Sequence, residues 1–503
     1  MLAALLVTAV LMQDAMPLRL VLPVGAILLV LAIRPRSSTA VGIALIAIPM
    51  VGLLRRVTAG PEAFVPDDPL AVLPIVAAMP ALAVAFTTGR TVRRTPGLNL
   101  FLAYVLWLLL TSLLSVGGSL TTQLTGLALA IVPAGVGYLV AAGRIPAVER
   151  LTTHTLIALP LLVGSYAVVQ FFQPPAWDLA WLRSVGNNFI SVGVPEPQGF
   201  RVWGTMESPL TAATYLGLGL LALLVVAVAR RNAPGRVLRT IGCALGAVLL
   251  LAALLLTSVR TVLFALPLLL AVMVLLDLIP GARRYGVLFL VVVVGGTTVG
   301  VGTLGLGPEG SDPDRYAISS ISEDTSFQER VDLLPAFLAA ATNPIGTGAG
   351  SSGVAKRLTE DGAARGIDNG YLTLVVEGGL IRLVLFLGLI GIAIVRAART
   401  ARRNPRDPTA LLGITALLYF GLLQTSADVI SNSLSIVFWI FLGVAIRGTS
   451  GQDTASLVPA GRRARYVDTE APTTQIPVVR VPAARTRYRL LPARSSLRPI
   501  VGR

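Results

Sequence analysis

Three arginines next to apolar segments are the residues of this chain best suited to chemistry. Arg201 lies in Phe200-Arg-Val-Trp-Gly-Thr-Met-Glu-Ser-Pro209, Arg260 lies in the turn Thr257-Ser-Val-Arg-Thr261, and Arg330 opens an amphipathic stretch. A guanidinium group presents a planar fork of donors that matches a phosphate group. These arginines therefore predict a binding site for an anionic phosphate group.

Each arginine also has a structural interpretation. Arg260 could cap a helix C-terminus or extend its charge towards lipid headgroups. Trp203 could be an interface anchor, and Arg330 could pair with Glu329 or Asp332 on a solvated face. Other arginines of the same loops are interpreted as ordinary loop residues, namely Arg183, Arg357 and Arg365.

A candidate general base stands where another apolar segment begins. Asp368 and Asn369 come just before Tyr371. An aspartate with its reference pKa of about 3.9 is ionised but weakly basic, and partial burial would raise that pKa and make it a better base. Both residues could equally N-cap the following helix. Competing carboxylates are Glu207, which could instead hold Arg201 by a salt bridge, and Glu377.

A glycine-rich turn precedes that base. In Asn343–Ser352 we expect glycines, Gly346 and Gly348 among them, to expose backbone N–H groups and support the site. The turn lacks the Lys-Ser/Thr of a Walker A motif, so ATP hydrolysis is not predicted. Glu377 and Arg382 are expected to form a structural pair, because an isolated charge within a membrane is costly.

The rarity of cysteine and histidine excludes other chemistry. Cys243 is the only cysteine and lies in an apolar segment, so no disulfide or thiolate metal site is expected. His154 is the only histidine, so we expect no catalytic triad or histidine metal site, and no cofactor.

Composition predicts an all-α, polytopic transmembrane helix bundle. Hydrophobic residues make up 54% and charged residues 13% of the chain, and apolar windows of ~17–25 residues recur as membrane-spanning helices require. Leu2–Met12 would be a fourteenth span, although it is short, and a cleaved signal peptide is not expected there. The 13 predicted spans are Leu18–Ile33, Ala40–Leu54, Leu70–Phe86, Leu98–Leu114, Leu124–Ala142, Leu151–Phe172, Leu210–Ala229, Val237–Leu256, Val262–Leu276, Val287–Leu304, Tyr371–Val395, Ala410–Ala427 and Val429–Ile446.

Arginine-rich loops predict the orientation. From Leu70 onward, basic loops alternate with loops of few or balanced charges, and basic loops face the cytoplasm. This places the loops 173–206 and 305–370 outside, together with the candidate arginines. Arg55 and Arg56 also fall outside and contradict the rule.

Two regions are predicted by this topology. Residues 1–447 form the bundle, with the site on its outer loops and a short surface helix near Leu338. Residues 448–503 carry ten arginines against three acidic residues and no apolar periodicity, so we expect a disordered cytoplasmic tail near anionic lipid headgroups, or a docking site for a cytoplasmic partner. Nucleic acid is not expected, because the net charge of +16 comes from inner loops and tail.

With these motifs in order, the chain resembles the membrane O-antigen ligase and lipid-linked glycan polymerase superfamily over roughly 200–396. The motifs are Arg-x-x-Gly-Thr before a span, a Ser-x-Arg turn, Arg followed by Asn-Pro-x-Gly-x-Gly, a polar pair before Tyr-Leu, and Glu-Gly. The resemblance implies metal-independent, inverting glycan transfer from an undecaprenyl-diphosphate carrier to a sugar hydroxyl, with arginines on the diphosphate and a base near the long loop.

Two positions depart from the family pattern. Ligases of the family usually have His before the Asn, where this chain has Asp368, and polymerase-like members often resemble it in having Asp. Arg382 stands where members usually have Gly. The first departure favours a polymerase over a ligase.

The resulting hypothesis is a glycosyltransferase-type polymerase or ligase of the bacterial cytoplasmic membrane, with a lipid-linked donor and a glycan acceptor. Under this hypothesis, envelope-biosynthesis proteins are candidate partners of the basic tail. The alternative is a transporter or flippase of an amphipathic anion, a class that gathers ionisable residues and broken helices near the bilayer midplane. A scaffold for envelope assembly is a third interpretation, but it leaves the outer arginines unexplained.

Overall fold

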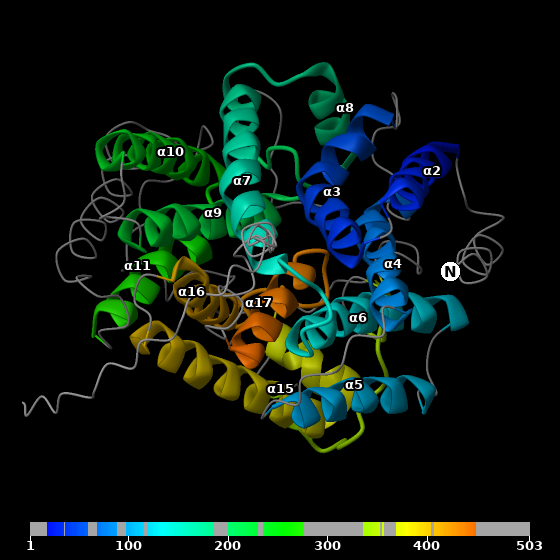
Figure 1. Ribbon diagram of the computed structural model, residues 1–503. Helices are drawn as coiled ribbons and strands as arrows, with labels where there is room; N and C mark the ends of the chain where they lie inside the picture. Colours follow the sequence, from blue (N-terminus) through cyan, green and yellow to red (C-terminus); the bar gives the residue numbers. More distant parts are fainter. Residues whose placement is uncertain are drawn as a thin grey trace, which may run out of the picture. The chain divides into compact units, whose positions relative to one another are not determined.

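The fold is seen in a computed structural model of the chain (Figure 1). It describes residues 18–34, 36–58, 68–87, 97–114, 119–185, 200–229, 235–275, 335, 337–352, 355–356, 369–403 and 407–448. All of these belong to the first of two compact units, Met1–Thr449.

The regular elements of this described part are helices, which confirms the predicted all-α bundle. Twelve of the predicted spans each overlap a helix of the structure; Val287–Leu304 and Leu2–Met12 lie outside the described residues. The helices are α2 (Leu18–Ile33), α3 (Ser37–Thr58), η1 (Pro69–Val72), α4 (Leu73–Thr87), α5 (Leu98–Leu113), α6 (Leu120–Ala141), α7 (Val148–Phe172), α8 (Ala176–Val185), α9 (Pro209–Ala229), α10 (Arg236–Thr257), α11 (Arg260–Leu275), α15 (Gly370–Arg403), α16 (Pro408–Leu423) and α17 (Ser435–Arg447).

Helix starts follow from short polar side chains. Ser119 accepts from the Thr122 amide at the start of α6, and Asp407 accepts from the Thr409 amide before α16. These caps satisfy amide donors that lack an intrahelical partner. Each cap therefore sets the residue at which its helix begins.

Two helices of the bundle, α17 and α9, are apolar and buried around their whole circumference. Helix α17 packs against α6, α7, α15 and α16 (Figure 1), and almost every residue of it is buried. Helix α9 is similarly buried and packs against α7, α10 and α16. A helix that is hydrophobic around its whole circumference is buried or spans a membrane.

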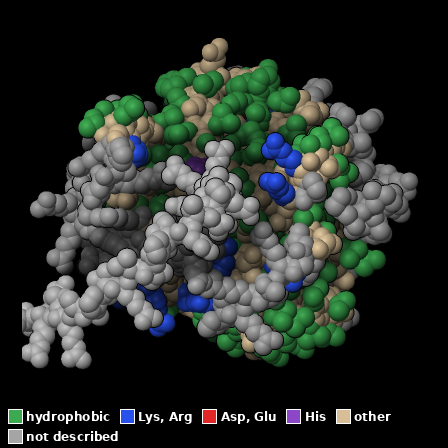
Figure 2. Space-filling view, in the orientation of Figure 1, with side chains coloured by type: hydrophobic (Ala, Val, Ile, Leu, Met, Phe, Trp, Pro, Cys, Tyr) green, Lys and Arg blue, Asp and Glu red, His purple; other side chains and the backbone are tan. Residues whose placement is uncertain are grey.

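The outer surface of the bundle is also apolar. In the view of Figure 2, hydrophobic side chains cover much of the described surface. Exposed leucines and valines line α5 and α10. Among the described residues, six helices are long and apolar enough to cross a membrane, and further apolar helices have 10–17 residues. These properties are those of a multi-pass membrane protein.

Hydrogen bonds and ion pairs join helix ends of the described part into two groups. At one end, the segment before α9 bonds to α3 and to the end of α10, and the start of α15 bonds to the end of α16. At the other end, Arg144 donates to the Ala85 carbonyl and Arg447 forms an ion pair with Glu149. The first group contains the segments of Arg201, Glu207 and Arg260 and the start of α15 with Asn369 and Tyr371, and we call it the site end.

Helix α15 contains a feature that its sequence pattern did not predict. Its helical path is broken at Gly379, which has φ 70° and ψ −179°. This backbone conformation is accessible essentially to glycine alone. The predicted span Tyr371–Val395 lies within α15 and consists of two helical segments that meet at Gly379.

Candidate functional site

The segment Phe200–Ser208, which carries Arg201, is built into the bundle. Val202, Trp203 and Met206 are buried, whereas Arg201 is half-buried. The Gln170 carboxamide oxygen of α7 accepts from the amides of Trp203 and Gly204, at 3.0 and 2.9 Å. These bonds hold the backbone beside Arg201 at the site end of α7.

The same segment touches the turn that carries Arg260. The Val202 amide donates to the Leu256 carbonyl at 3.3 Å, in the last turn of α10. Ser258 then takes a left-handed conformation, φ 52°, and Arg260 begins α11. Thus the structure brings the chain segments of Arg201 and Arg260 together. Arg330 lies outside the described residues.

Glu207 has a partner that the sequence did not indicate. Its carboxylate lies 2.7 Å from the Arg55 guanidinium and is about one-third exposed. Arg55 and its neighbour Arg56 lie in the last turn of α3 and are buried. Their disagreement with the positive-inside rule was the only signal of a role, because their partners lie far away in the sequence.

The glycine-rich turn is docked on the break in α15. The amides of Thr347 and Gly348 donate to the carbonyls of Val376 and Glu377, at 2.8 and 2.9 Å. A Cβ on Gly346 would lie 2.6 Å from the amide nitrogens of Gly378 and Gly379. The turn and the broken helix therefore form one rigid unit.

This contact corrects the expectation that Gly346 and Gly348 expose their backbone N–H groups. The Gly346 amide donates to the Asn343 side chain at 3.1 Å, and the Gly348 amide bonds to Glu377. Both donors are used inside the protein: the Gly346 amide within the turn, and the Gly348 amide on a carbonyl beside the break in α15, where carbonyls need donors. The glycines support the site by allowing close approach.

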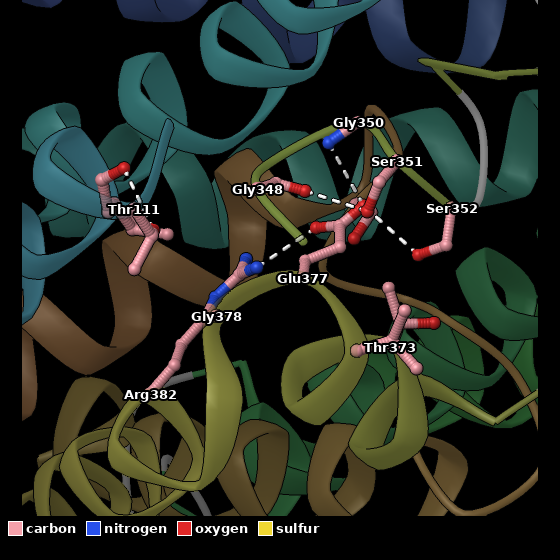
Figure 3. Close-up of polar contacts among 12 residues, drawn as sticks. Thr111, Gly348, Gly350, Ser351, Ser352, Thr373, Glu377, Gly378 and Arg382 are labelled. Atoms are coloured by element: carbon pink, nitrogen blue, oxygen red, sulfur yellow. Dashed lines mark hydrogen bonds and ion pairs between the residues drawn. The ribbon is translucent and has the colours of Figure 1, made fainter. Parts of the chain in front are cut away.

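Glu377 and Arg382 form the predicted structural pair. Figure 3 shows the Glu377 carboxylate between the turn and Arg382. One oxygen lies 2.9 Å from Arg382, and the other accepts from the Gly350 amide at 3.1 Å and the Ser352 hydroxyl at 3.2 Å. Both side chains are buried. With both oxygens bonded, the Glu377 side chain fastens the turn to α15.

The start of α15 is fixed by neighbours at the site end. The Asn369 side chain accepts from the Leu372 amide at 3.0 Å, so Asn369 has the predicted capping role. The Gly370 amide donates to the Gln424 carbonyl at 2.9 Å, and the Tyr371 hydroxyl to the Gly421 carbonyl at 2.8 Å. Asp368 lies outside the described residues, directly before this anchored start.

Asp428 is a carboxylate of this region that sequence reasoning missed. It follows α16 and accepts from the amides of Ile430 and Ser431, at 3.3 and 3.1 Å. The side-chain amide nitrogen of Gln424 lies 3.5 Å from the Asp428 carboxylate. The backbone carbonyl of the same glutamine accepts from the Gly370 amide. Burial raises the pKa of Asp428 above its ordinary value. The sequence feature that could have identified Asp428 is its position as an acidic residue between two long apolar segments.

A comparison with protein families finds a match over part of the chain. Residues 245–387 match the family described as O-antigen ligase, a range that includes Arg260, the glycine-rich turn and the broken part of α15. No curated protein matches the chain. The match supports a membrane protein that ligates or polymerises glycans. Over these residues, the chain is similar to the O-antigen ligase family.

Proposed function

We propose that the protein transfers a glycan from a polyprenyl-diphosphate-linked donor to a hydroxyl of a second glycan, at the outer face of the bacterial cytoplasmic membrane. Arg201, Arg260 and Arg330 bind the diphosphate, and Asp368, oriented by its neighbour Asn369, accepts the hydroxyl proton. The reaction needs no metal in this scheme. The family match supports glycan transfer, and the arginine segments support the donor class.

The observation that carries the proposal is the hydrogen bond between Val202 and Leu256. It joins two segments that are more than fifty residues apart and that each carry an arginine. Two guanidinium groups brought to one end of an apolar bundle suit a diphosphate whose lipid tail lies along the helices. Positive N-terminal dipoles of α9 and α11 at this end favour the same anion.

The chemical step follows from these roles. The acceptor oxygen bonds to the anomeric carbon, its proton passes to the carboxylate, and the bond from that carbon to the diphosphate oxygen breaks. The leaving diphosphate gains negative charge, which fixed arginines stabilise. Losing one such donor typically costs ~10²–10³ in rate.

The identity of residue 368 supports polymerisation over ligation. Asp368 stands where resembling ligases usually have His, and polymerase-like members often have Asp. The acceptor would then be the glycan carried by a second lipid-linked molecule.

A transporter of an amphipathic anion is the second candidate, because α15 is broken and carries buried charges. Transporters use such broken helices to bind substrates and ions. Here the break is occupied: the Asn343–Ser352 turn bonds to the freed carbonyls, and both Glu377 oxygens have partners. This favours the transferase.

Purified protein in lipid nanodiscs tests the two functions. We expect a polyprenyl-diphosphate-linked radiolabelled oligosaccharide to yield a ladder of longer glycans and free polyprenyl diphosphate, without added metal. A single addition would indicate ligation. Intact donor in nanodiscs, together with its translocation in proteoliposomes, would contradict the proposal and favour the transporter.

A further inference from the structure

Two adjacent arginines at the end of α3 are buried at the site end of the bundle. Arg55 is 5% and Arg56 1% exposed. Desolvating a guanidinium costs several kcal/mol unless close partners compensate it. At a helix end that is predicted to face outward, such a pair also opposes the positive-inside rule. The groups that compensate these two buried charges therefore indicate what the arginines do.

Arg56 holds the backbone of the segment that carries Arg201. Its guanidinium donates to the Met206 carbonyl at 2.5 Å and to the Gly204 carbonyl at 2.6 Å. Its Nε lies 2.6 Å from Asp178 of α8. The guanidinium also lies over the Trp203 ring, 5.7 Å from its centroid, in the range of a cation–π contact.

The fit between α3 and this segment is close along several residues. Thr205 donates from its hydroxyl to the Pro49 carbonyl at 2.6 Å, and the Leu53 amide donates to the Thr205 carbonyl at 2.7 Å. A Cβ on Gly52 would lie 2.3 Å from the Met206 backbone. The segment therefore has one position relative to α3.

Arg55 links this segment to a different part of the chain. Its Nε lies 3.2 Å from Asp68, the cap of η1, and one terminal nitrogen lies 2.7 Å from Glu207. Its guanidinium lies over the Trp181 ring of α8 at 5.4 Å. Asp68 is fully enclosed, whereas Glu207 is about one-third exposed. Among the ion pairs that Arg55 and Arg56 form with Asp68, Asp178 and Glu207, the Arg55–Glu207 pair is thus the most exposed to solvent.

We infer that Arg55 and Arg56 are positioning residues that hold the Phe200–Ser208 segment so that Arg201 meets the donor diphosphate. This rests on the proposed function. Arg56 fixes the backbone at Gly204 and Met206, and Arg55 fixes the side chain of the next residue, Glu207. Neither is assigned a contact with the donor. An arginine displaced by about 1 Å can lose a large part of its effect, roughly 10²-fold in rate.

Arg55 is the better residue to substitute, because removing Arg56 leaves two backbone carbonyls and Asp178 without their donor and can prevent folding. Arg55→Ala should lower kcat/KM for the lipid-linked donor roughly 10–100-fold. Arg55→Lys should recover part of this loss, because an ammonium can approach Glu207 or Asp68 but lacks the fork that spans both.

A double-mutant cycle with Arg201 separates positioning from general stability. If Arg55 acts through Arg201, Arg55→Ala should cost less than about threefold in an Arg201→Ala background. The matched control is Arg447→Ala, which removes an ion-paired arginine at the other end of the bundle. It should lower the unfolding temperature without changing donor KM.

Donor binding is measured alongside transfer, with a fluorescent polyprenyl diphosphate and the matching monophosphate as probes. Arg55→Ala should weaken diphosphate binding more than monophosphate binding. Equal weakening of both probes, or multiplicative effects of Arg55→Ala and Arg201→Ala on transfer, would overturn the inference while leaving the transferase intact. Wild-type protein that binds neither probe and transfers no glycan would overturn the proposed function and the inference with it.

Discussion

Glu377 and Arg382 form a 2.9 Å ion pair that spans the break in α15 at Gly379. The glutamate also holds Gly350 and Ser352 of the glycine-rich turn. Trp107 of α5 donates to the Gly378 carbonyl at 2.7 Å, which satisfies a group that the break leaves free. The break, the turn and the pair are therefore one structural device, and it lies in the part of the chain that the O-antigen ligase family matches.

Removing one partner of this pair should be more harmful than removing both. Glu377→Ala leaves Arg382 charged and buried, and breaking a buried pair costs about 3–5 kcal/mol. In Glu377→Gln/Arg382→Met no net charge is left buried, so we expect a smaller loss. Thermal unfolding in detergent measures both variants. A double variant no more stable than Glu377→Ala would contradict the interpretation.

Gly379 should not tolerate a side chain. A Cβ there would lie 1.9 Å from the Pro344 carbonyl oxygen, and φ of 70° adds strain worth about 1–3 kcal/mol. We expect Gly379→Ala to lower the unfolding temperature sharply and to detach the turn. Gly391→Ala in the same helix is the control, because nothing lies within 4 Å of its Cβ. It should be neutral or stabilising by up to ~1 kcal/mol. Equal stability of the two variants would show that the turn is not held at Gly379.

The positions of the helices were predictable because each predicted span is an apolar run of bilayer length separated from the next by polar residues. Helix α9, predicted as Leu210–Ala229, spans Pro209–Ala229. The break in α15 was not predictable in the same way. Gly378 and Gly379 lie inside a long apolar run, and only the approach of Pro344 makes a bend necessary.

The ion pairs of the site end were harder to predict than the helices. Arg55 and Glu207 are separated by 152 positions, so local spacing carries no information on their contact. The positive-inside rule marked Arg55 and Arg56 as unusual. Their partners Asp68, Asp178 and Glu207 could be identified only from the packing of α3 with η1, α8 and the Phe200–Ser208 segment.

The orientation of the bundle is open to a direct labelling experiment. In a Cys243→Ser background, Ser320→Cys and Trp177→Cys should react with a membrane-impermeant maleimide on intact cells. Trp177 lies on α8 at the site end and is 40% exposed. Ser450→Cys should react only after permeabilisation. Protection of position 320 or labelling of position 450 in intact cells would reverse the predicted topology.

Asp428 should make stability depend on pH. Burial raises the pKa of its carboxyl, opposed by hydrogen bonds from Ser431 and by the charge of Arg382. The folded protein therefore keeps a proton that the unfolded chain releases near pH 3.9, so stability falls as pH rises from there to the folded pKa. Above that value the effect is constant.

The variant Asp428→Asn tests this titration, because it retains an oxygen for the amides of Ile430 and Ser431. The wild-type unfolding temperature should fall relative to the variant as pH rises through this window. A difference between the two proteins that stays constant with pH would show that Asp428 does not titrate as expected.

The proposed base is tested by Asp368→Asn, which keeps shape and capping ability but cannot accept the hydroxyl proton. We expect transfer to fall roughly 10²–10⁴-fold with unchanged expression. Asn369→Asp, which keeps the cap on the Leu372 amide, is the matched control and should retain folding. Transfer by Asp368→Asn at the wild-type rate would mean that Asp368 is not the base. Because Glu207 is paired with Arg55 and Glu377 with Arg382, Asp428 would then be the carboxylate to test next, and its asparagine variant would have to lose transfer at neutral pH.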